Sequence, residues 1–369
     1  MRREDYDKIL ELRHELHAHP ELSLNENETK KRLIKFLAEN TTLAIVDCGG
    51  WFYAARYLEG TPAIAFRADM DALPIDELNN NLSYSSQAQG VAHKCGHDGH
   101  CAVLCGLALE LEKLEPHRSC YLIFQHAEEI GQGGKVCAKF LDERNITEIY
   151  AFHNLSGWPE GSIITRKGLC QLASEGLTIK FIGRASHASE PEKGVNPAYA
   201  LAQLIIYIKE LLKLNQEILC TPVNINLGGK NFGISPGDGE VSFTLRAASS
   251  ESINLFAEKI SAKAQELAAI YKIDKYSCEI LDYFPETVSE GWCVEQVNKA
   301  ADKLGLKRLD MPKPWRASED FGYYTQRRSG AIFYIGNGES WPALHTCGYD
   351  FNDNIIANAV NVFLELYKN

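Results

Sequence analysis

Short apolar segments that run directly into acidic or imidazole side chains constrain the fold of this chain more than any other feature. Three of them are residues 63–68, followed by Asp69-Met70-Asp71; residues 121–124, followed by Gln125-His126-Ala127-Glu128-Glu129; and residues 148–152, followed by His153. Apolar runs of this length are typical of strands buried on both faces of a sheet. A fourth such segment, residues 331–335, precedes a loop that carries His345. The polar side chains are therefore predicted to follow the ends of buried strands.

Amphipathic segments with helical spacing separate these strands and indicate an α/β fold. They are residues 4–18, 26–39, 101–114, 291–304 and 355–366. Strands that alternate with helices favour a mixed sheet flanked by helices. Open sheets of this type bind ligands beyond the carboxyl ends of their strands. We therefore expect the polar side chains that follow the strands to share one rim.

The pattern changes between residues 172 and 284, where the predicted order is strand, helix, strand, strand, helix, strand. This order is that of a ferredoxin-like α+β unit. We therefore predict an inserted second domain at residues 172–284. Residues 1–171 and 285–369 would then form the first domain, which resumes after the insertion.

The charge of the chain argues against nucleic acids and anionic membranes as partners. Its 369 residues carry a net charge of −11, and it has no basic tract that could displace counterions from phosphates. The arginines at its start are followed by no apolar region, and nowhere do 18 or more apolar residues run together. We therefore expect neither export nor membrane insertion. Eleven cysteines without a framework spacing favour a reducing cytoplasm.

The densest group of reactive side chains is residues 93–100, His93-Lys94-Cys95-Gly96-His97-Asp98-Gly99-His100. Thiolate and imidazole are suitable ligands for zinc, nickel, cobalt or manganese, and a glycine lets the backbone turn tightly between them. Because Cys95 and His97 are two positions apart, they would face different sides of a helix. We therefore expect both to bind a metal from a loop.

Three further side chains extend this pair to a larger ligand set. They are a carboxylate of the Glu128-Glu129 pair, His153 and His345. Five ligands exceed the four that a tetrahedral zinc ion uses. We therefore predict two neighbouring divalent ions per chain, which could be manganese, zinc, nickel or cobalt, with the thiolate of Cys95 suited to bridge them.

The adjacent glutamates 128 and 129 can divide two tasks. Neighbouring side chains diverge at the end of a strand, so one carboxylate can bind a metal while the other acts as general base toward water. The pattern does not show which of the two is the base.

Motifs spread over nearly the whole chain resemble those of a known family. They are Arg13-His14-Glu15-Leu16-His17 with Pro20-Glu21, Phe66-Arg67-Ala68-Asp69-Met70-Asp71-Ala72-Leu73-Pro74, Cys95-Gly96-His97-Asp98, Ala127-Glu128-Glu129, Ser186-His187-Ala188 and Leu344-His345. Together they resemble the amidohydrolase branch of the two-metal metallopeptidases, peptidase family M20, which includes hippurate hydrolase, N-acyl-amino-acid amidohydrolases and auxin-conjugate hydrolases. The resemblance implies a two-metal aminopeptidase-like catalytic domain. The inserted segment would correspond to the family's lid or dimerisation domain.

The resemblance also implies roles for individual residues. The family's metal ligands fall on Cys95, His97, Glu129, His153 and His345, and its catalytic base falls on Glu128. In the inserted domain, His187 would help to polarise the scissile carbonyl and Arg246 would bind the substrate carboxylate. One departure is His126, which stands where the family usually has proline and is either an extra imidazole near the metals or a plain strand residue.

Three aspartates near the ligands are candidates for fixing the tautomers of the ligand histidines. They are Asp69, Asp71 and Asp98, and each would accept a hydrogen bond from an imidazole N–H. Their place beside the ligands in the sequence predicts a supporting position behind the metals.

The resulting hypothesis is a metal-dependent amidohydrolase that cleaves the amide bond of small-molecule N-acyl amino acids. Water would be the nucleophile and Glu128 the general acid and base. We also expect a homodimer formed through the inserted domain. The alternatives are a dipeptidase or carboxypeptidase with the same site, a cysteine hydrolase that uses Cys95 with His97 or His153 as base, and a metal-binding dimer without catalysis.

Overall fold

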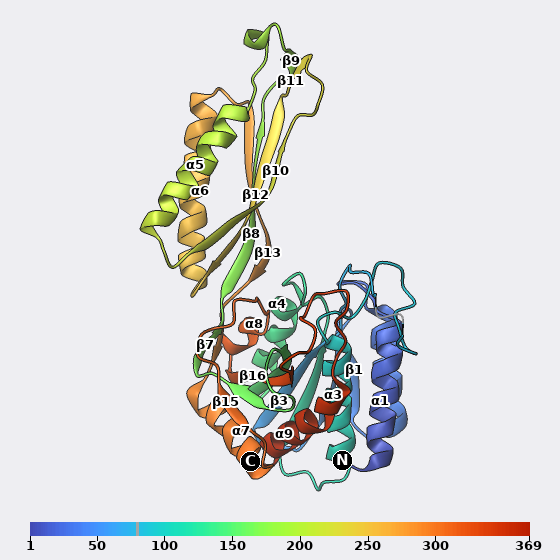
Figure 1. Ribbon diagram of the computed structural model, residues 1–369. Coiled ribbons are helices and arrows are strands. Elements are labelled where there is room, and N and C mark those ends of the chain that lie inside the picture. Colours follow the sequence, from blue (N-terminus) through green and yellow to red (C-terminus); the bar gives the residue numbers. More distant parts are fainter. Residues whose placement is uncertain (79–80) are drawn as a thin grey trace. The chain divides into compact units, whose positions relative to one another are not determined.

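A computed structural model describes residues 1–78 and 81–369 of the chain, which form two compact units (Figure 1). The first unit comprises Met1–Cys170, Thr287–Pro314 and Glu319–Asn369. The second unit comprises Gln171–Glu286 and the short segment Trp315–Ser318. The chain therefore passes into the second unit twice, and the second, four-residue passage was not expected from the sequence.

A mixed sheet is the centre of the first unit. Its strands are β1 (Ala44–Asp47), β2 (Phe52–Arg56), β3 (Ala63–Asp69), β4 (Ser119–Gln125), β5 (Ile146–Ser156), β6 (Ile163–Thr165), β15 (Arg308–Asp310) and β16 (Ser329–Gly338), in the order β1-β2-β4-β3-β5-β16-β6-β15. The four central strands β4, β3, β5 and β16 are mutually parallel. Their carboxyl ends consequently meet at one edge of the sheet, as the sequence predicted. A separate pair joins β7 (Gly168–Gln171) and β14 (Thr287–Ser289).

Helices pack around this sheet. The longer ones are α1 (Arg3–Ala18), α2 (Asn27–Asn40), α3 (His97–Leu111), α7 (Gly291–Lys303) and α9 (Ile356–Lys368). Four short helices are α4 (Gly133–Cys137), η1 (Ala138–Glu143), α8 (Gly322–Thr325) and η3 (Asp353–Ile355). Every residue of α3 is buried, because α1, α9 and β3 all pack against it. One apolar core joins these helices to the strands. The predicted α/β class is thus confirmed.

The start of α3 differs from the expectation that both Cys95 and His97 lie in a loop. Cys95 does precede the helix, but His97 is its first residue. Gly96 makes the connection with a φ of +107°, and a Cβ there would come within 2.5 Å of the Asn154 side chain. Only glycine fits this turn comfortably, and the turn brings the two side chains to one side despite the helical position of His97.

The second unit contains six main elements in the order strand, helix, strand, strand, helix, strand. They are β8 (Ala173–Ile182), α5 (Ala198–Leu214), β10 (Leu219–Leu227), β12 (Asp238–Ala247), α6 (Ser250–Ile270) and β13 (Lys275–Phe284). The strands form an antiparallel sheet in the order β10-β12-β8-β13, and α5 and α6 pack on it. A small pair of β9 (Ser186–His187) and β11 (Ile234–Ser235) and the turn η2 (Pro191–Lys193) complete the unit.

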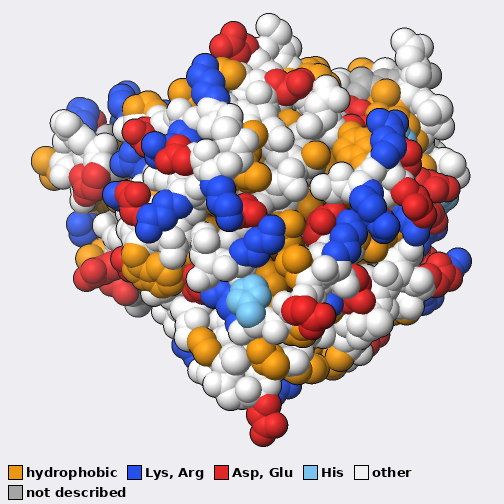
Figure 2. Space-filling model, turned by 90° about the horizontal axis from the view of Figure 1, so that it is seen from below, with side chains coloured by type: hydrophobic (Ala, Val, Ile, Leu, Met, Phe, Trp, Pro, Cys, Tyr) orange, Lys and Arg blue, Asp and Glu red, His pale blue; other side chains and the backbone are white. Residues whose placement is uncertain are grey.

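Charged side chains of both signs cover the surface of the first unit that Figure 2 presents. Lys and Arg side chains are interspersed there with Asp and Glu, and apolar side chains lie between them (Figure 2). Among the residues that the structure describes, no helix is long and apolar enough to cross a membrane.

Strand β8 carries a carboxyl group on the face that packs against the helices. Glu175 lies on the same face of the strand as Leu177 and Ile179 and is only 1% exposed. Neither of its carboxylate oxygens has a hydrogen-bond partner. Burial raises the pKa of Glu175 to about 7, because the charged form loses its hydration without gaining a partner.

Glu175→Gln is expected to stabilise the protein at pH 8 and to have little effect near pH 4.5. A carboxyl group whose pKa is raised on folding costs no folding free energy below its unfolded pKa. The cost grows as pH rises from the unfolded pKa to the folded pKa and is fully present above the folded pKa. We expect a gain of about 2 kcal/mol in the free energy of unfolding at pH 8. Calorimetric unfolding at both pH values measures it, and equal stability of the two proteins at pH 8 would contradict it.

Candidate metal centre

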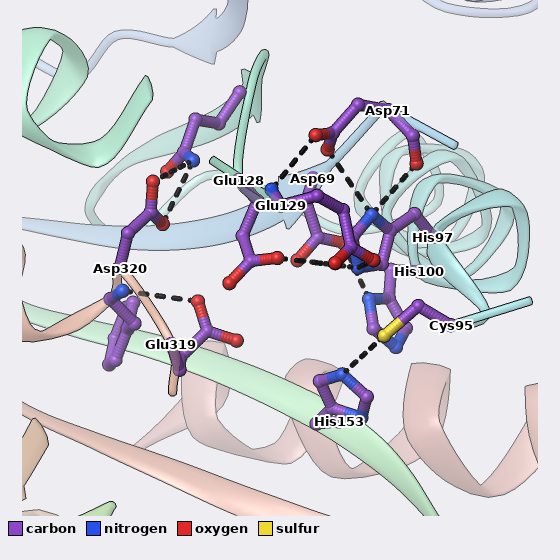
Figure 3. Close-up of polar contacts among 12 residues, drawn as sticks. Asp69, Asp71, Cys95, His97, His100, Glu128, Glu129, His153, Glu319 and Asp320 are labelled. Atoms are coloured by element: carbon purple, nitrogen blue, oxygen red, sulfur yellow. Dashed lines mark hydrogen bonds and ion pairs between the residues drawn. The ribbon is translucent and has the colours of Figure 1, made fainter. Parts of the chain in front are cut away.

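The five predicted ligands come together at the carboxyl edge of the central sheet. Cys95 lies just before α3, His97 begins α3, Glu129 follows β4, His153 lies within β5, and His345 lies in the loop after β16. Figure 3 shows the first four of these side chains turned toward a common space. The rim predicted from the strand ends is therefore a real cluster of side chains.

Two groups of ligand atoms overlap at one thiol. Cys95, His97 and His153 form one group and Cys95, Glu129 and His345 form the other, and within each group the ligand atoms lie within 4.8 Å of one another. The Sγ atom of Cys95 is 3.4 Å from Nε2 of His153 and 3.3 Å from Nε2 of His345. This sharing of the thiol is the arrangement expected of a ligand that bridges two ions.

Hydrogen bonds fix the tautomers of two of the histidines. Nδ1 of His97 lies 2.9 Å from the backbone oxygen of Asp71, and Nδ1 of His153 lies 2.8 Å from the backbone oxygen of Asn154. A carbonyl oxygen can only accept, so both Nδ1 atoms carry a proton, and in the neutral imidazole each Nε2 atom is then the one with a lone pair. Nε2 of His97 has no hydrogen-bond partner and is directed at the carboxylates of Glu128 and Glu129, 3.8 and 3.7 Å away.

Asp71 supports the site from behind in two ways. Its Oδ1 lies 3.2 Å from Nδ1 of His97, and its Oδ2 accepts hydrogen bonds from the backbone N–H of Glu129 at 2.9 Å and from the hydroxyl of Ser23 at 2.7 Å. One carboxylate thus orients a candidate imidazole ligand and the backbone of a candidate carboxylate ligand. The role of Asp71 in supporting bound metal ions stays a prediction.

The other two aspartates have different partners. Asp69 pairs with Nδ1 of His100 at 2.6 Å and lies farther, at 3.7 Å, from Nε2 of His97. Asp98 turns to helix α1, where it contacts Nδ1 of His17 at 2.7 Å and Nε of Arg13 at 3.2 Å. The structure therefore brings Asp69 to a neighbour of the ligands, whereas it directs Asp98 toward the N-terminal helix.

The balance of buried charge fits the binding of cations. The buried acids around the space are Asp69, Asp71, Glu128, Glu319 and Asp320, Glu129 beside them is partly buried, and Arg67 is a buried arginine among them. Burial raises the pKa of Glu129 to about 7, and burial together with Glu319 and Glu129 raises that of Glu128. An oxygen of Glu129 also lacks a hydrogen-bond partner. Unpaired buried carboxylates are costly unless they bind a metal, so the donor set fits divalent ions.

Sequence reasoning missed the acids that face Glu128. Carboxylate oxygens of Glu319 and Asp320 lie within 4.8 Å of a carboxylate oxygen of Glu128. Arg67 holds both, at 3.1 Å from Glu319 and 2.6 Å from Asp320. Glu319 and Asp320 are adjacent in the sequence, but no apolar strand precedes them. The pattern that predicted the other residues, a polar side chain directly after a buried strand, is therefore missing here.

Three other predicted residues have contacts of their own within their units. The ring of His126 packs against Gly50, and its Nδ1 lies 3.8 Å from the thiol of Cys137. In the second unit, the exposed His187 contacts Ser189, and Arg246 donates to the backbone oxygen of Arg316 and to the hydroxyl of Ser318 at 2.6 and 2.8 Å. The roles of His187 and Arg246 toward substrate stay predictions.

Comparison with known proteins defines the class to which the fold and site belong. The model of Peptidase family M20/M25/M40 matches residues 65–369. The chain is 30% identical to a hippurate hydrolase of Campylobacter jejuni over 98% of its own length and 95% of that protein. It is 28% identical to an N-acetylcysteine deacetylase of Bacillus subtilis, again over 98% of its own length and 96% of the relative.

A solved structure agrees with the sequence matches. It is that of a Bacillus subtilis protein described as a dinuclear metal-binding peptidase of the M20 family, with a TM-score of 0.82, 25% identity and coverage of 99% of this chain and 98% of that one. The fold and the site thus define a metal-dependent amide-bond hydrolase. The chain belongs to Peptidase family M20/M25/M40, and the predicted resemblance is confirmed.

Proposed function

We propose that this protein hydrolyses the amide bond of N-acyl amino acids. The observation that carries the proposal is a cluster in which two candidate ligand groups share one thiol and a further carboxyl group stands beside them. Two ligand groups share Cys95, and Glu128 belongs to neither of them; its carboxyl group instead lies near His97 and Glu129 on one side and Glu319 and Asp320 on the other. The names of two relatives, hippurate hydrolase and N-acetylcysteine deacetylase, support an acylated amino acid as the substrate class.

The proposed ligands would hold two divalent ions, which supply Lewis-acid chemistry and make water nucleophilic near neutral pH. These ligands are Cys95, His97, Glu129, His153 and His345. Manganese, zinc, nickel and cobalt all suit such a mixed set of sulfur, nitrogen and oxygen donors. The backbone oxygens of Asp71 and Asn154 keep the imidazoles of His97 and His153 ready to bind.

Glu128 is the proposed general base and acid. Its carboxylate accepts a proton from the attacking water and then donates that proton to the amine nitrogen as the carbon–nitrogen bond breaks. The products are a carboxylic acid and a free amino acid. Burial and the neighbouring carboxylates of Glu319 and Glu129 raise the pKa of Glu128, which favours a group that both takes up and releases a proton.

The second unit is proposed as a lid and dimerisation domain of ferredoxin-like type, as the strand and helix order of β8, α5, β10, β12, α6 and β13 supports. In this proposal His187 polarises the scissile carbonyl and Arg246 binds the substrate carboxylate.

The eleven cysteines are free, which supports a location in the cytoplasm.

The exposed edge of the second unit's sheet leads to a prediction about the oligomeric state. Within the described residues, β10 pairs only with β12, and Ile225 on β10 is 59% exposed beside exposed Val223 and Leu227. An apolar edge strand of this kind favours pairing with another chain. We expect a dimer by light scattering, a monomer for Ile225→Lys, and a retained dimer for Ile206→Lys, since Ile206 is equally exposed (61%) but lies on α5. A monomeric wild-type protein would contradict this prediction.

A substrate panel tests the proposed function. The metal-reconstituted protein is assayed against N-acetyl, N-benzoyl, N-succinyl and long-chain acyl amino acids, together with dipeptides. Release of free amino acid from at least one acyl series, faster than dipeptide cleavage, is the expected result. Faster cleavage of dipeptides would favour the dipeptidase alternative, and metal uptake without turnover of any compound would favour a metal-binding protein without catalysis.

A further inference from the structure

The turn that carries Glu128 and Glu129 is held by a residue far away in sequence. Glu26 precedes helix α2, its side chain is buried (4% exposed), and its Oε1 accepts a hydrogen bond from the backbone N–H of Ala127 at 2.7 Å. Neither the motifs nor the strand pattern of the sequence singled out Glu26. Its carboxyl group reaches the peptide directly before the proposed general base.

The residue that receives this contact has an unusual backbone conformation. Ala127 has a φ of +49°, in the left-handed region where a side chain with a Cβ is disfavoured. Its backbone oxygen accepts hydrogen bonds from the N–H groups of Gln132 and Gly133, at 3.1 and 3.0 Å. Both polar groups of Ala127 are therefore occupied, one by Glu26 and the other by the following loop. Strained conformations persist where the surroundings determine them fully.

The two glutamates directly follow this left-handed residue. Glu128 faces Glu319 and Nε2 of His97 (Figure 3). Glu129 lies 3.7 Å from the same His97 nitrogen and also approaches Nε2 of His345 at 3.8 Å. Asp71 holds the backbone N–H of Glu129 from the other side. The backbone on each side of Glu128 is thus tied to a carboxylate from another loop, and Glu26 is the one that contacts no candidate metal ligand.

We propose that Glu26 is a positioning residue for Glu128: its carboxyl oxygen holds Ala127 in the left-handed conformation from which the general base enters the site beside the metal ligand Glu129. The inference rests on the proposed role of Glu128. What Glu26 contributes is a buried hydrogen-bond acceptor. Burial and the charge of Asp71 raise the pKa of Glu26 to about 7, so a neutral acceptor is expected to replace it near neutral pH.

Two substitutions at Glu26 separate the acceptor from the charge. Glu26→Gln retains an acceptor oxygen and is expected to keep kcat within about threefold of wild type, because a neutral amide oxygen still accepts. Glu26→Leu removes the acceptor and is expected to lower kcat by about 10- to 100-fold with little change in KM, as misplacement of a catalytic group does. An equal loss of kcat in both variants would overturn the proposal.

A second-site substitution tests the backbone conformation itself. Glycine adopts positive φ without the steric penalty of alanine. Ala127→Gly is therefore expected to restore about tenfold of the lost kcat in the Glu26→Leu protein, and to change kcat less than about threefold in the wild-type protein. A merely structural role for Glu26 predicts no such rescue, and its absence would contradict the proposal.

A matched control and a readout without turnover complete the test. Glu21 accepts a hydrogen bond from the backbone N–H of Thr29 at 2.7 Å on the same helix start, so Glu21→Leu is expected to lower Tm without the loss of kcat. Hydrogen exchange of the peptide that contains Ala127 is expected to accelerate in Glu26→Leu but not in Glu21→Leu. If no substrate is turned over, the proposed function fails, whereas the exchange result still decides the contact. Unchanged exchange in Glu26→Leu would overturn the inference.

Discussion

Glu128→Gln is expected to lower kcat by about a thousandfold while two metal ions remain bound. The amide of glutamine cannot take a proton from water, yet it preserves the size of the side chain. Glu128 belongs to neither ligand group that shares Cys95, although its carboxylate lies near His97 and Glu129. Because we assign it as the base and not as a ligand, we expect its substitution to leave the metal content unchanged. Metal analysis by mass spectrometry and steady-state kinetics on the same preparation measure both quantities.

The neighbouring variant Glu129→Gln is the matched comparison. It replaces a carboxylate by an amide, as Glu128→Gln does, but at the next residue. We expect this variant to lose metal as well as activity because Glu129 belongs to a ligand group with Cys95 and His345. Loss of metal in Glu128→Gln, with metal retained in Glu129→Gln, would reverse the roles assigned to the two glutamates.

Removal of metal by a chelator is expected to abolish activity, and restored manganese or zinc is expected to return it. This result separates the proposed mechanism from the cysteine hydrolase alternative, in which a thiol would attack the substrate and a chelator would have no effect. Burial and Glu129 raise the pKa of the Cys95 thiol, which disfavours a free thiolate nucleophile. Activity that survives complete removal of metal would contradict the proposal.

Cys95→Ser extends the same test to a single residue. Because Cys95 is common to both ligand groups, its loss is expected to reduce the metal content to one ion or none and activity by at least about 100-fold. Cys347→Ser is the control, since Cys347 is two residues from His345 but belongs to neither group. Equal losses in the two variants would show that the effect is not specific to the shared ligand.

Much of the fold could be predicted from local patterns. The apolar segments before Asp69 and Glu128 became β3 and β4, and the amphipathic segment at residues 4–18 became α1, within a few residues. Burial on both faces requires apolar residues at successive positions, which makes such strands visible in sequence. Short strands such as β6 and β15 were missed, because three residues carry too little pattern to stand out.

The sequence by itself determined the chemistry of the candidate site: the residue types Cys, His and Glu, their place after buried strands, and the family to which the chain belongs. Only the tertiary structure decided how these groups are arranged. It showed that Cys95 is common to two ligand groups, that Glu319 and Asp320 face Glu128, and that Glu26 holds Ala127. Strand ends are local features, whereas hydrogen bonds and charge contacts between loops about a hundred or more positions apart depend on packing, which no local pattern encodes.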